Sequence, residues 1–359
     1  MESSTGGTHT RSEILSQPRC WADCFKALDA NAQLQQVGKR WTPPPDWVFI
    51  GCGSSYYVAL GAAASWTALT GQPARAVPAS ELLLFPDLVL SESRPCQPVV
   101  ISRSGHTSEA LRVAEFLEAQ RNIRTLAISC ATHQKLEEIS TLTIYQLPAD
   151  EQSTVMTRSF TSMLLGLQAL AAEQAKQKEF AAGLRRLPAR MAPRMEELAG
   201  RVEQFVKTHT FADYVYLGQG PFFGIANEGM LKVMEMSCSY GQCFHTLEFR
   251  HGPKSIVGPE TLVTFLLSES GYEAECEVLE EVKGLGATTL VIANQADGAA
   301  RRAADFLVEL QLDVPEYARL AAYIIPGQFL GLYTGLKKGF DPDRPRNLSR
   351  AVILNDRNS

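Results

Sequence analysis

The chain of 359 residues lacks several features that would assign it to a class at once. No apolar run reaches the ~18 residues that a membrane-spanning helix needs, so we expect no membrane partner. The first 11 residues are polar and lack an apolar core, which predicts a disordered N-terminus and no secretory signal. The net charge is −5, and without a surplus of basic residues a nucleic-acid partner is not expected.

The chain also lacks the usual cysteine motifs. It has eight cysteines but no Cys-x-x-Cys pair, and no histidine stands near Cys20 and Cys24 to complete a metal site. Cys52 has no His–Asn partner pattern, which argues against a nucleophile. We therefore expect reduced thiols in a cytoplasmic protein that uses neither a metal nor another cofactor.

One strand–helix junction has the composition of an anion site. The apolar run Val99–Ile101 predicts a strand buried on both faces, and helical spacing follows from Leu111 to Leu117. The junction supplies hydroxyls, a cation, a glycine and the N–H groups of a helix start, from Ser102, Arg103, Ser104, Gly105, His106 and Thr107. These groups predict a phosphate cradle, and the alternative is a serine-rich turn that caps a helix.

A second junction has the same character. The apolar run Trp47–Ile50 is followed by Gly51-Cys52-Gly53-Ser54-Ser55-Tyr56 and an alanine-rich helical pattern. Loops from neighbouring parallel strands meet at the carboxyl edge of the sheet, where open α/β sheets bind ligands. Two hydroxyl-rich loops at one edge favour the phosphate-binding interpretation.

The pattern of the first half recurs in the second. Tyr214–Gly220 matches Trp47–Gly53, and Phe265–Gly271 matches Val99–Gly105. Strand–helix alternation predicts an α/β fold with two copies of one parallel sheet, each with helices on both faces in three layers. The expected boundaries are a disordered N-terminus at 1–11, a helical lead-in at 12–45, a first copy at 46–174, a helical connector at 175–207 and a second copy at 208–354.

The two copies differ at the cradle. The second copy has Pro221-Phe222 in place of Ser54-Ser55, and Glu269 in place of Arg103. Because an acidic side chain repels phosphate, we expect the anion site in the first copy only.

The second copy carries candidate acid–base groups instead. Glu228, Lys232 and Glu235 stand at i, i+4 and i+7 on one helical face among apolar residues, which predicts a partly buried charged stripe. The alternative is a solvated salt-bridge face. His251 is followed by Gly252-Pro253 and should lie on a loop, as a candidate acid–base group or as an ordinary surface residue.

Three motifs carry a family resemblance: Gly51–Tyr56, Ser102–Thr107 and Glu248–Ser255 resemble the sugar isomerase (SIS) domain family. The tandem arrangement is similar to the isomerase half of glucosamine-6-phosphate synthase. It is more similar to the galactosamine-6-phosphate deaminase/isomerase group, also called tagatose-6-phosphate ketose/aldose isomerases. Asp150–Gln152 and Met156-Thr157 favour that second group. The resemblance covers nearly the whole chain and implies two tandem SIS domains.

The resemblance also implies roles for individual residues. The phosphate ligands would be Ser54, Ser55, Ser102, Ser104 and Thr107, with Arg103 in place of a glutamine of the synthase pattern. Glu235 would carry a proton between C1 and C2, with Glu228 and Lys232 as polar companions. His251 would open the sugar ring and reach into the site of a second subunit, which implies a homodimer with shared active sites or a higher oligomer. Other candidates for substrate contact are Gly53, His106, Gln152, Thr157 and Arg350.

One departure from the synthase pattern concerns the C-terminal segment. Arg350 stands where the synthase has a lysine that forms a Schiff base with an open-chain ketose. An arginine stays protonated and cannot attack a carbonyl, so we do not expect imine chemistry through this residue.

The expected function is isomerisation or deamination of a hexosamine 6-phosphate or hexose 6-phosphate. One alternative is a fructosamine-6-phosphate deglycase or an isomerising transaminase-like lobe. An alternative of another class is a non-catalytic regulator that only binds phosphosugars.

Overall fold

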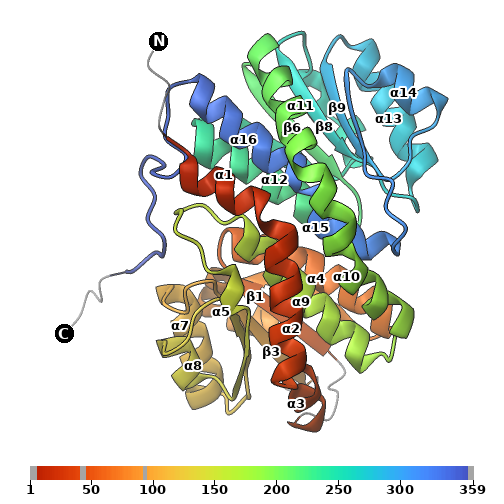
Figure 1. Ribbon diagram of the computed structural model, residues 1–359. Coiled ribbons are helices and arrows are strands. Elements are labelled where there is room, and N and C mark those ends of the chain that lie inside the picture. The colour runs from red at the N-terminus through yellow and green to blue at the C-terminus, as the bar shows by residue number, and fades with distance from the viewer. Residues whose placement is uncertain (1–5, 41–45, 92–94, 355–359) are drawn as a thin grey trace. The chain divides into compact units, whose positions relative to one another are not determined.

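The computed structural model describes residues 6–40, 46–91 and 95–354 (Figure 1). Contacts divide the chain into two units, and each is described by itself. The first-repeat unit consists of Arg19–Glu151, Arg158–Arg185 and Ser349–Ser359. The second-repeat unit consists of Met1–Pro18, Gln152–Thr157 and Arg186–Leu348.

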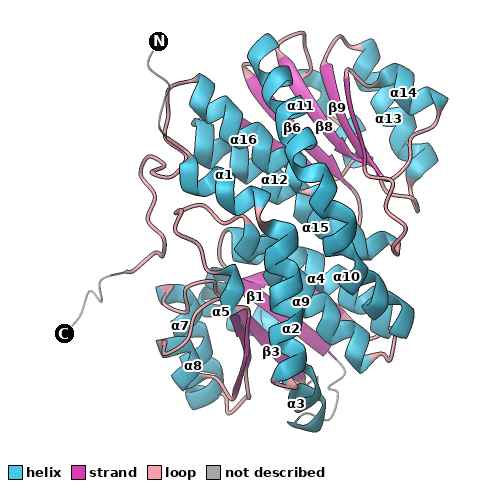
Figure 2. Ribbon diagram, viewed as in Figure 1, coloured by secondary structure: helices cyan, strands magenta, loops and turns pink. Residues whose placement is uncertain are grey.

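Each unit holds one five-stranded, fully parallel sheet (Figure 2). The strands of the first-repeat unit lie in the order β2-β1-β3-β4-β5, with bounds β1 (Asp46–Gly51), β2 (Ala74–Pro78), β3 (Cys96–Ile101), β4 (Leu126–Ser129) and β5 (Leu142–Tyr145). Those of the second-repeat unit lie in the order β10-β9-β8-β6-β7, with bounds β6 (Asp213–Gly218), β7 (Tyr240–Phe244), β8 (Thr261–Leu266), β9 (Thr288–Ala293) and β10 (Phe306–Glu309). Counted within its own unit, each sheet has the order 2-1-3-4-5, which confirms two copies of one α/β architecture.

The first sheet is covered on both faces because its strands are apolar on both faces. Trp47 of β1 packs against Trp66, with 3.9 Å between the centroids of the tilted rings, whereas Val48 and Ile50 point into a separate apolar cluster with Val113. All four strand residues Trp47–Ile50 are buried, as the continuous apolar run predicts. The helices that begin in this unit are α3 (Gln33–Arg40), α4 (Ser54–Thr70), α5 (Ala79–Leu84), α6 (Pro86–Val89), α7 (Ser108–Glu115), η1 (Phe116–Gln120), α8 (Lys135–Ile139), η2 (Leu147–Ala149), α9 (Arg158–Gln174) and α10 (Lys178–Met191).

The second sheet is likewise enclosed. Val215, Phe265 and Val291 of adjacent strands form an apolar cluster with Leu279, and the opposite face carries Tyr216, packed beneath the helix that follows β6. The helices that begin in this unit are α1 (Thr8–Leu15), α2 (Gln17–Ala30), η3 (Ala192–Arg194), α11 (Met195–Thr208), α12 (Phe222–Ser237), η4 (Glu248–Arg250), η5 (Pro253–Ile256), α13 (Tyr272–Gly284), α14 (Gly298–Ala303), η6 (Glu316–Arg319), α15 (Leu320–Tyr323) and α16 (Ile325–Lys337).

The N-terminal segment differs from expectation. Residues 8–11 begin α1, so the prediction of disorder is wrong there, while residues 1–5 lie outside the described residues. The Asp343 carboxylate accepts hydrogen bonds from the backbone N–H groups of His9 (3.0 Å) and Thr10 (2.7 Å), at the first turn of α1. An acidic group stabilises a helix start because it accepts hydrogen bonds from the N–H groups that have no partner within the helix. This acidic group comes from the far end of the chain.

The other segments outside the copies are helical where they are described. The lead-in is interrupted between α1, α2 and α3, and its last part, residues 41–45, lies outside the described residues. The connector consists of α10, η3 and α11, and the boundary between the two units falls within α10. Across the described ranges, no helix is both long and apolar enough to cross a membrane.

Candidate functional site

The strand order brings the two serine-rich loops to one sheet edge. β1 and β3 pair directly and in parallel, although β2 comes between them in the sequence. The connections from these two strands leave in opposite directions across the sheet, and such a switch point is where an open α/β sheet forms a crevice at its carboxyl end. The loop from β1 to α4 and the loop from β3 to α7 therefore flank the switch point of the first-repeat unit.

Glycines shape the loop from β1 to α4. A Cβ on Gly51 would lie 2.4 Å from the carbonyl carbon of Ser55, and Gly53 has a φ of 54°, which favours glycine. Ser54 and Ser55 form the first turn of α4 and are buried. The second copy places glycines at the same two points, Gly218 and Gly220.

The loop from β3 to α7 is closed by its own hydroxyls. The buried Ser102 accepts a hydrogen bond at Oγ from the N–H of Gly105 (3.2 Å), and Ser104 accepts one from the N–H of His106 (3.2 Å). His106 is exposed and Ser104 is half-buried. Thr107 precedes the first residue of α7, yet its side chain makes no capping hydrogen bond. The serines thus close the turn within the loop and Thr107 does not cap α7, while the phosphate cradle stays a prediction.

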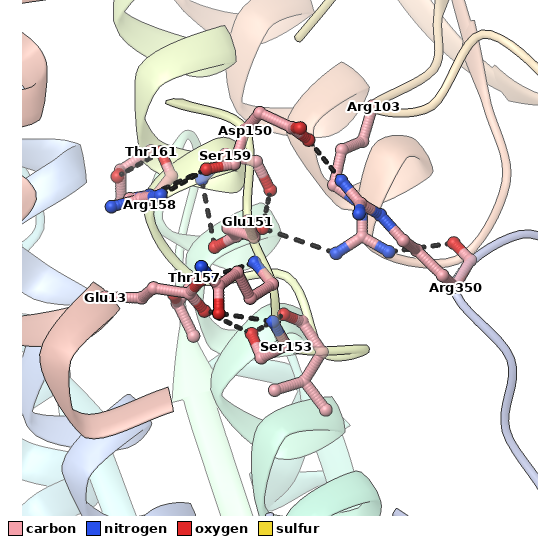
Figure 3. A network of polar contacts seen from close by, with 12 residues as sticks. Glu13, Arg103, Asp150, Glu151, Ser153, Thr157, Arg158, Ser159, Thr161 and Arg350 are labelled. Carbon is pink, nitrogen blue, oxygen red and sulfur yellow. Dashed lines mark hydrogen bonds and ion pairs between the residues drawn. The ribbon is translucent and has the colours of Figure 1, made fainter. Parts of the chain in front are cut away.

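Arg103 is directed into the first-repeat unit (Figure 3). Its guanidinium is buried, with Nη1 3.3 Å from Oε2 of Glu151, and Nη2 donates to the carbonyl of Arg350 (2.8 Å). Glu151 in turn accepts hydrogen bonds from the N–H and the hydroxyl of Ser159 at the start of α9. These contacts tie the serine loop to α9, and the role of Arg103 as a direct phosphate ligand stays a prediction.

The C-terminal segment lies against the start of α7. The guanidinium of Arg350 pairs with Asp150 (Figure 3), the N–H of Ser108 donates to the carbonyl of Val352 (3.0 Å), and the N–H of Leu354 donates to Oγ of Ser108 (2.9 Å). Arg350 thus belongs to a segment next to the serine loop.

Gln152 and Thr157 lie in a short segment of the second-repeat unit that is held by Glu13 of α1 (Figure 3). The Glu13 carboxylate accepts hydrogen bonds from the backbone N–H groups of Gln152 (2.5 Å) and Ser153 (3.4 Å). Gln152 is exposed, whereas Thr157 is fully buried and its carbonyl accepts a hydrogen bond from Gln328 (3.3 Å). Sequence reasoning missed Glu13, because nothing near it in the sequence marks its partners.

The charged stripe on α12 is buried, so the interpretation as a solvated face is wrong. Nζ of Lys232 lies 3.1 Å from Oε1 of Glu228 and 2.5 Å from Oε2 of Glu235. The side chains of Lys232 and Glu228 are fully buried, whereas that of Glu235 is 19% exposed. Burial alone would lower the pKa of Lys232, but the two carboxylates outweigh it and raise that pKa. Lys232 is therefore a permanent ammonium, and Glu235 is the member of the stripe that a ligand can reach.

α16 covers α12 through a row of glycines. Gly327, Gly331 and Gly335 are spaced four apart on one helix face, and a Cβ on Gly331 would lie 2.7 Å from the carbonyl oxygen of Lys232. The backbones of α12 and α16 therefore approach closely at Lys232. The four-residue spacing of these glycines is visible in the sequence, but sequence reasoning missed it.

His251 lies on an exposed loop directly after η4, as predicted. Its N–H donates to the carbonyl of Glu248 (3.0 Å). The structure adds His245 in the same loop, stacked on Phe223 at the start of α12 with 3.7 Å between the ring centroids. Desolvation lowers the pKa of His245, against an opposing effect of Glu248.

The chain is similar to known proteins over most of its length. The family model for the SIS domain matches residues 45–173 and 213–325. The chain is 26% identical to glutamine–fructose-6-phosphate aminotransferase (isomerizing) of Pyrobaculum aerophilum, over 95% of this chain and 57% of that protein. It thus spans about half the length of the curated relatives it matches.

Two solved structures cover nearly the whole chain. Glucosamine-6-phosphate deaminase of Thermotoga maritima is 28% identical with a TM-score of 0.79, over 97% of this chain and all of that one (100%). Tagatose-6-phosphate ketose/aldose isomerase of Escherichia coli is 23% identical with a TM-score of 0.84. The match covers 100% of this chain and 99% of that one, and it shows the shared fold. Because the two matched segments make up more than half of its length, the chain belongs to the SIS domain family.

Proposed function

We propose that the protein is an enzyme that moves a proton between C1 and C2 of a hexosamine 6-phosphate or hexose 6-phosphate, and releases ammonia when the substrate is an amino sugar. The observation that carries this proposal is the position of Glu235 and its pairing with Lys232. It is the partly exposed carboxylate of a buried charged stripe, and the ammonium of Lys232 holds it in place. Such a carboxylate can take a proton from one carbon and return it to the next.

The phosphate is assigned to the serine loops of the first-repeat unit. Ser54, Ser55, Ser102, Ser104 and Thr107 supply neutral donors at two helix starts that flank the switch point of the sheet. Neutral donors and helix N-termini suit a dianion, because they stabilise its charge without a competing counter-ion. Gly53, His106, Gln152, Thr157 and Arg350 remain proposed substrate contacts.

The chemistry then runs in three steps. His251 assists opening of the sugar ring by moving a proton between the ring oxygen and the C1 hydroxyl. Glu235 abstracts the proton at C2 and delivers it to C1, through an enediol for a hexose or an enol-amine for an amino sugar. With an amino sugar the product is an imine at C2, which water hydrolyses to a ketone and ammonia. Lys232 stays protonated and orients Glu235.

A panel of hexose and hexosamine 6-phosphates tests the proposal, with ketose and ammonia measured in the same samples. Isomerisation alone gives ketose without ammonia, and deamination gives both in equal amounts. Release of a free sugar phosphate from a fructosamine 6-phosphate would instead indicate a deglycase. Binding without turnover across the panel would contradict the proposal and favour a non-catalytic regulator.

A further inference from the structure

The loop after β8 in the second-repeat unit holds a carboxylate from elsewhere in the chain. Oε1 of Glu316, in η6, accepts hydrogen bonds from the backbone N–H groups of Glu269 (2.6 Å) and Ser270 (3.3 Å). Its Oε2 accepts a hydrogen bond from the hydroxyl of Ser270 (2.8 Å). Two successive backbone N–H groups and a hydroxyl thus converge on one anionic group, which lies 46 residues further along the chain than Ser270.

This loop is the twin of the serine loop in the first-repeat unit. Both follow the third strand of their unit and read Ser-x-Ser-Gly. In both, the first serine accepts a hydrogen bond from the glycine N–H, at 2.9 Å from Gly271 to Ser268 and at 3.2 Å from Gly105 to Ser102. The two loops therefore present the same kind of donors at equivalent switch points.

The charge of Glu269 does not by itself explain why only one loop would bind phosphate. Its Oε1 accepts hydrogen bonds from Nη1 of Arg319 (2.5 Å) and from Nδ2 of Asn294 (3.2 Å). The acidic side chain that we expected to repel an anion is thus compensated by a cation. The donors of this loop are instead occupied by Glu316.

We propose that Glu316 is an internal oxyanion, which fills the anion-binding loop of the second repeat and thereby bars it to external oxyanions. Removal of this carboxylate should open the loop to a small oxyanion such as sulfate or orthophosphate. The inference rests on the proposed function only in assigning the substrate phosphate to the first repeat, and it is independent of the reaction catalysed. Ser270 and Glu269 are exposed, so an external ion can reach their donors.

The test uses the full chain carrying Glu316→Ala, in a Ser104→Ala background that weakens the first loop. Thermal unfolding is followed in sodium sulfate and in sodium chloride at equal ionic strength, and sulfate binding is measured by calorimetry. Glu280→Ala, in the same background, is the matched control, because Glu280 is an exposed glutamate of α13. The Ser104→Ala chain without a second substitution gives the general effect of sulfate on stability.

Glu316→Ala should lower the unfolding midpoint in chloride, and sulfate should recover it by several degrees more than in the background chain or the control. Calorimetry should show sulfate binding at least tenfold tighter than in those two chains. An equal sulfate response in all three chains would overturn the proposal. If Glu316→Ala does not fold in chloride, refolding in sulfate should recover it, and failure of that rescue would also overturn the proposal.

The two proposals fail separately. If Glu316→Ala gains sulfate binding but the parent chain turns over no sugar phosphate, only the proposed function is contradicted. Turnover of a sugar phosphate by the parent chain without a sulfate gain in Glu316→Ala would contradict only the role of Glu316.

Discussion

The ammonium nitrogen of Lys232 lies 2.5 Å from a carboxylate oxygen of Glu235, and the lysine side chain is fully buried. The same nitrogen lies 3.1 Å from the buried Glu228. A buried charge is tolerated only when it is paired, so Lys232 compensates the buried Glu228 and holds Glu235 in position.

Lys232→Met should therefore be strongly destabilising, by about 3–5 kcal/mol, because it leaves Glu228 buried without its cation. Urea-induced unfolding measures this loss. Lys207→Met is the matched control, because it removes an exposed pair with Glu203 on α11 and should change stability by at most about 1 kcal/mol. Similar losses in the two variants would contradict the burial of the stripe.

Ionisation of Glu275 predicts a pH dependence of stability. Burial raises the pKa of Glu275 to about 7, despite its hydrogen bonds from Ser268, and the Glu316 carboxylate adds to the rise. A carboxyl with a raised pKa favours the folded state when protonated, so this stability is present at low pH and is lost as the pH rises through about 7.

Glu275→Gln removes that ionisation. The unfolding free energy of Glu275→Gln relative to the parent should increase by about 3 kcal/mol between pH 5 and pH 8.5. Urea titrations at the two pH values measure the change, with Glu280→Gln on the exposed side of the same helix as the control. A difference that does not vary with pH would show that Glu275 is ionised throughout this range.

Ser55→Ala with Ser104→Ala tests the phosphate site. Each substitution removes a neutral donor to a dianion and should cost roughly 1–3 kcal/mol of binding. Calorimetry should show weaker binding of a sugar phosphate and unchanged binding of the unphosphorylated sugar. Ser12→Ala, at an exposed position of α1, is the control. Equal weakening for both sugars would place the phosphate elsewhere.

Assembly is tested by mixing inactive subunits. We predict a homodimer in which His251 of one chain completes the site that contains Glu235 of the other. Glu235→Gln and His251→Ala proteins should each be inactive, and unfolding and refolding them together should restore partial activity. A fully active protein that sediments strictly as a monomer would rule out a shared site.

The sequence predicted the local and periodic features. Trp47–Ile50 and Val99–Ile101 were expected to be buried on both faces, and they are, because continuous apolar runs report their own burial. The repeat predicted two like sheets, and the i, i+4, i+7 spacing predicted a partly buried charged stripe on α12. These features depend on residues close together in the sequence.

Contacts between distant residues were not predictable in this way. Glu316 reaches Ser270 across 46 positions and Asp343 reaches Thr10 across 333, and neither carboxylate has a local pattern that distinguishes it from a solvated one. The same holds for Glu151, which pairs with Arg103. From the neighbouring sequence alone, the guanidinium of Arg103 was expected to be available to a phosphate. Long-range polar pairing requires the fold to be known first.

Glu235 is the residue that we propose transfers the proton. Glu235→Gln keeps shape and hydrogen bonding but removes basicity, and it should reduce turnover by about 100-fold or more while phosphosugar binding survives. Glu228→Gln serves as the comparison, because Glu228 pairs with the same lysine but is fully buried.

Incorporation of solvent deuterium at the carbon that receives the proton is the most direct measurement. Glu235→Gln should lose this incorporation in parallel with turnover. If Glu235→Gln still incorporates deuterium at nearly the parent rate, Glu235 is structural and the assignment of the base is contradicted.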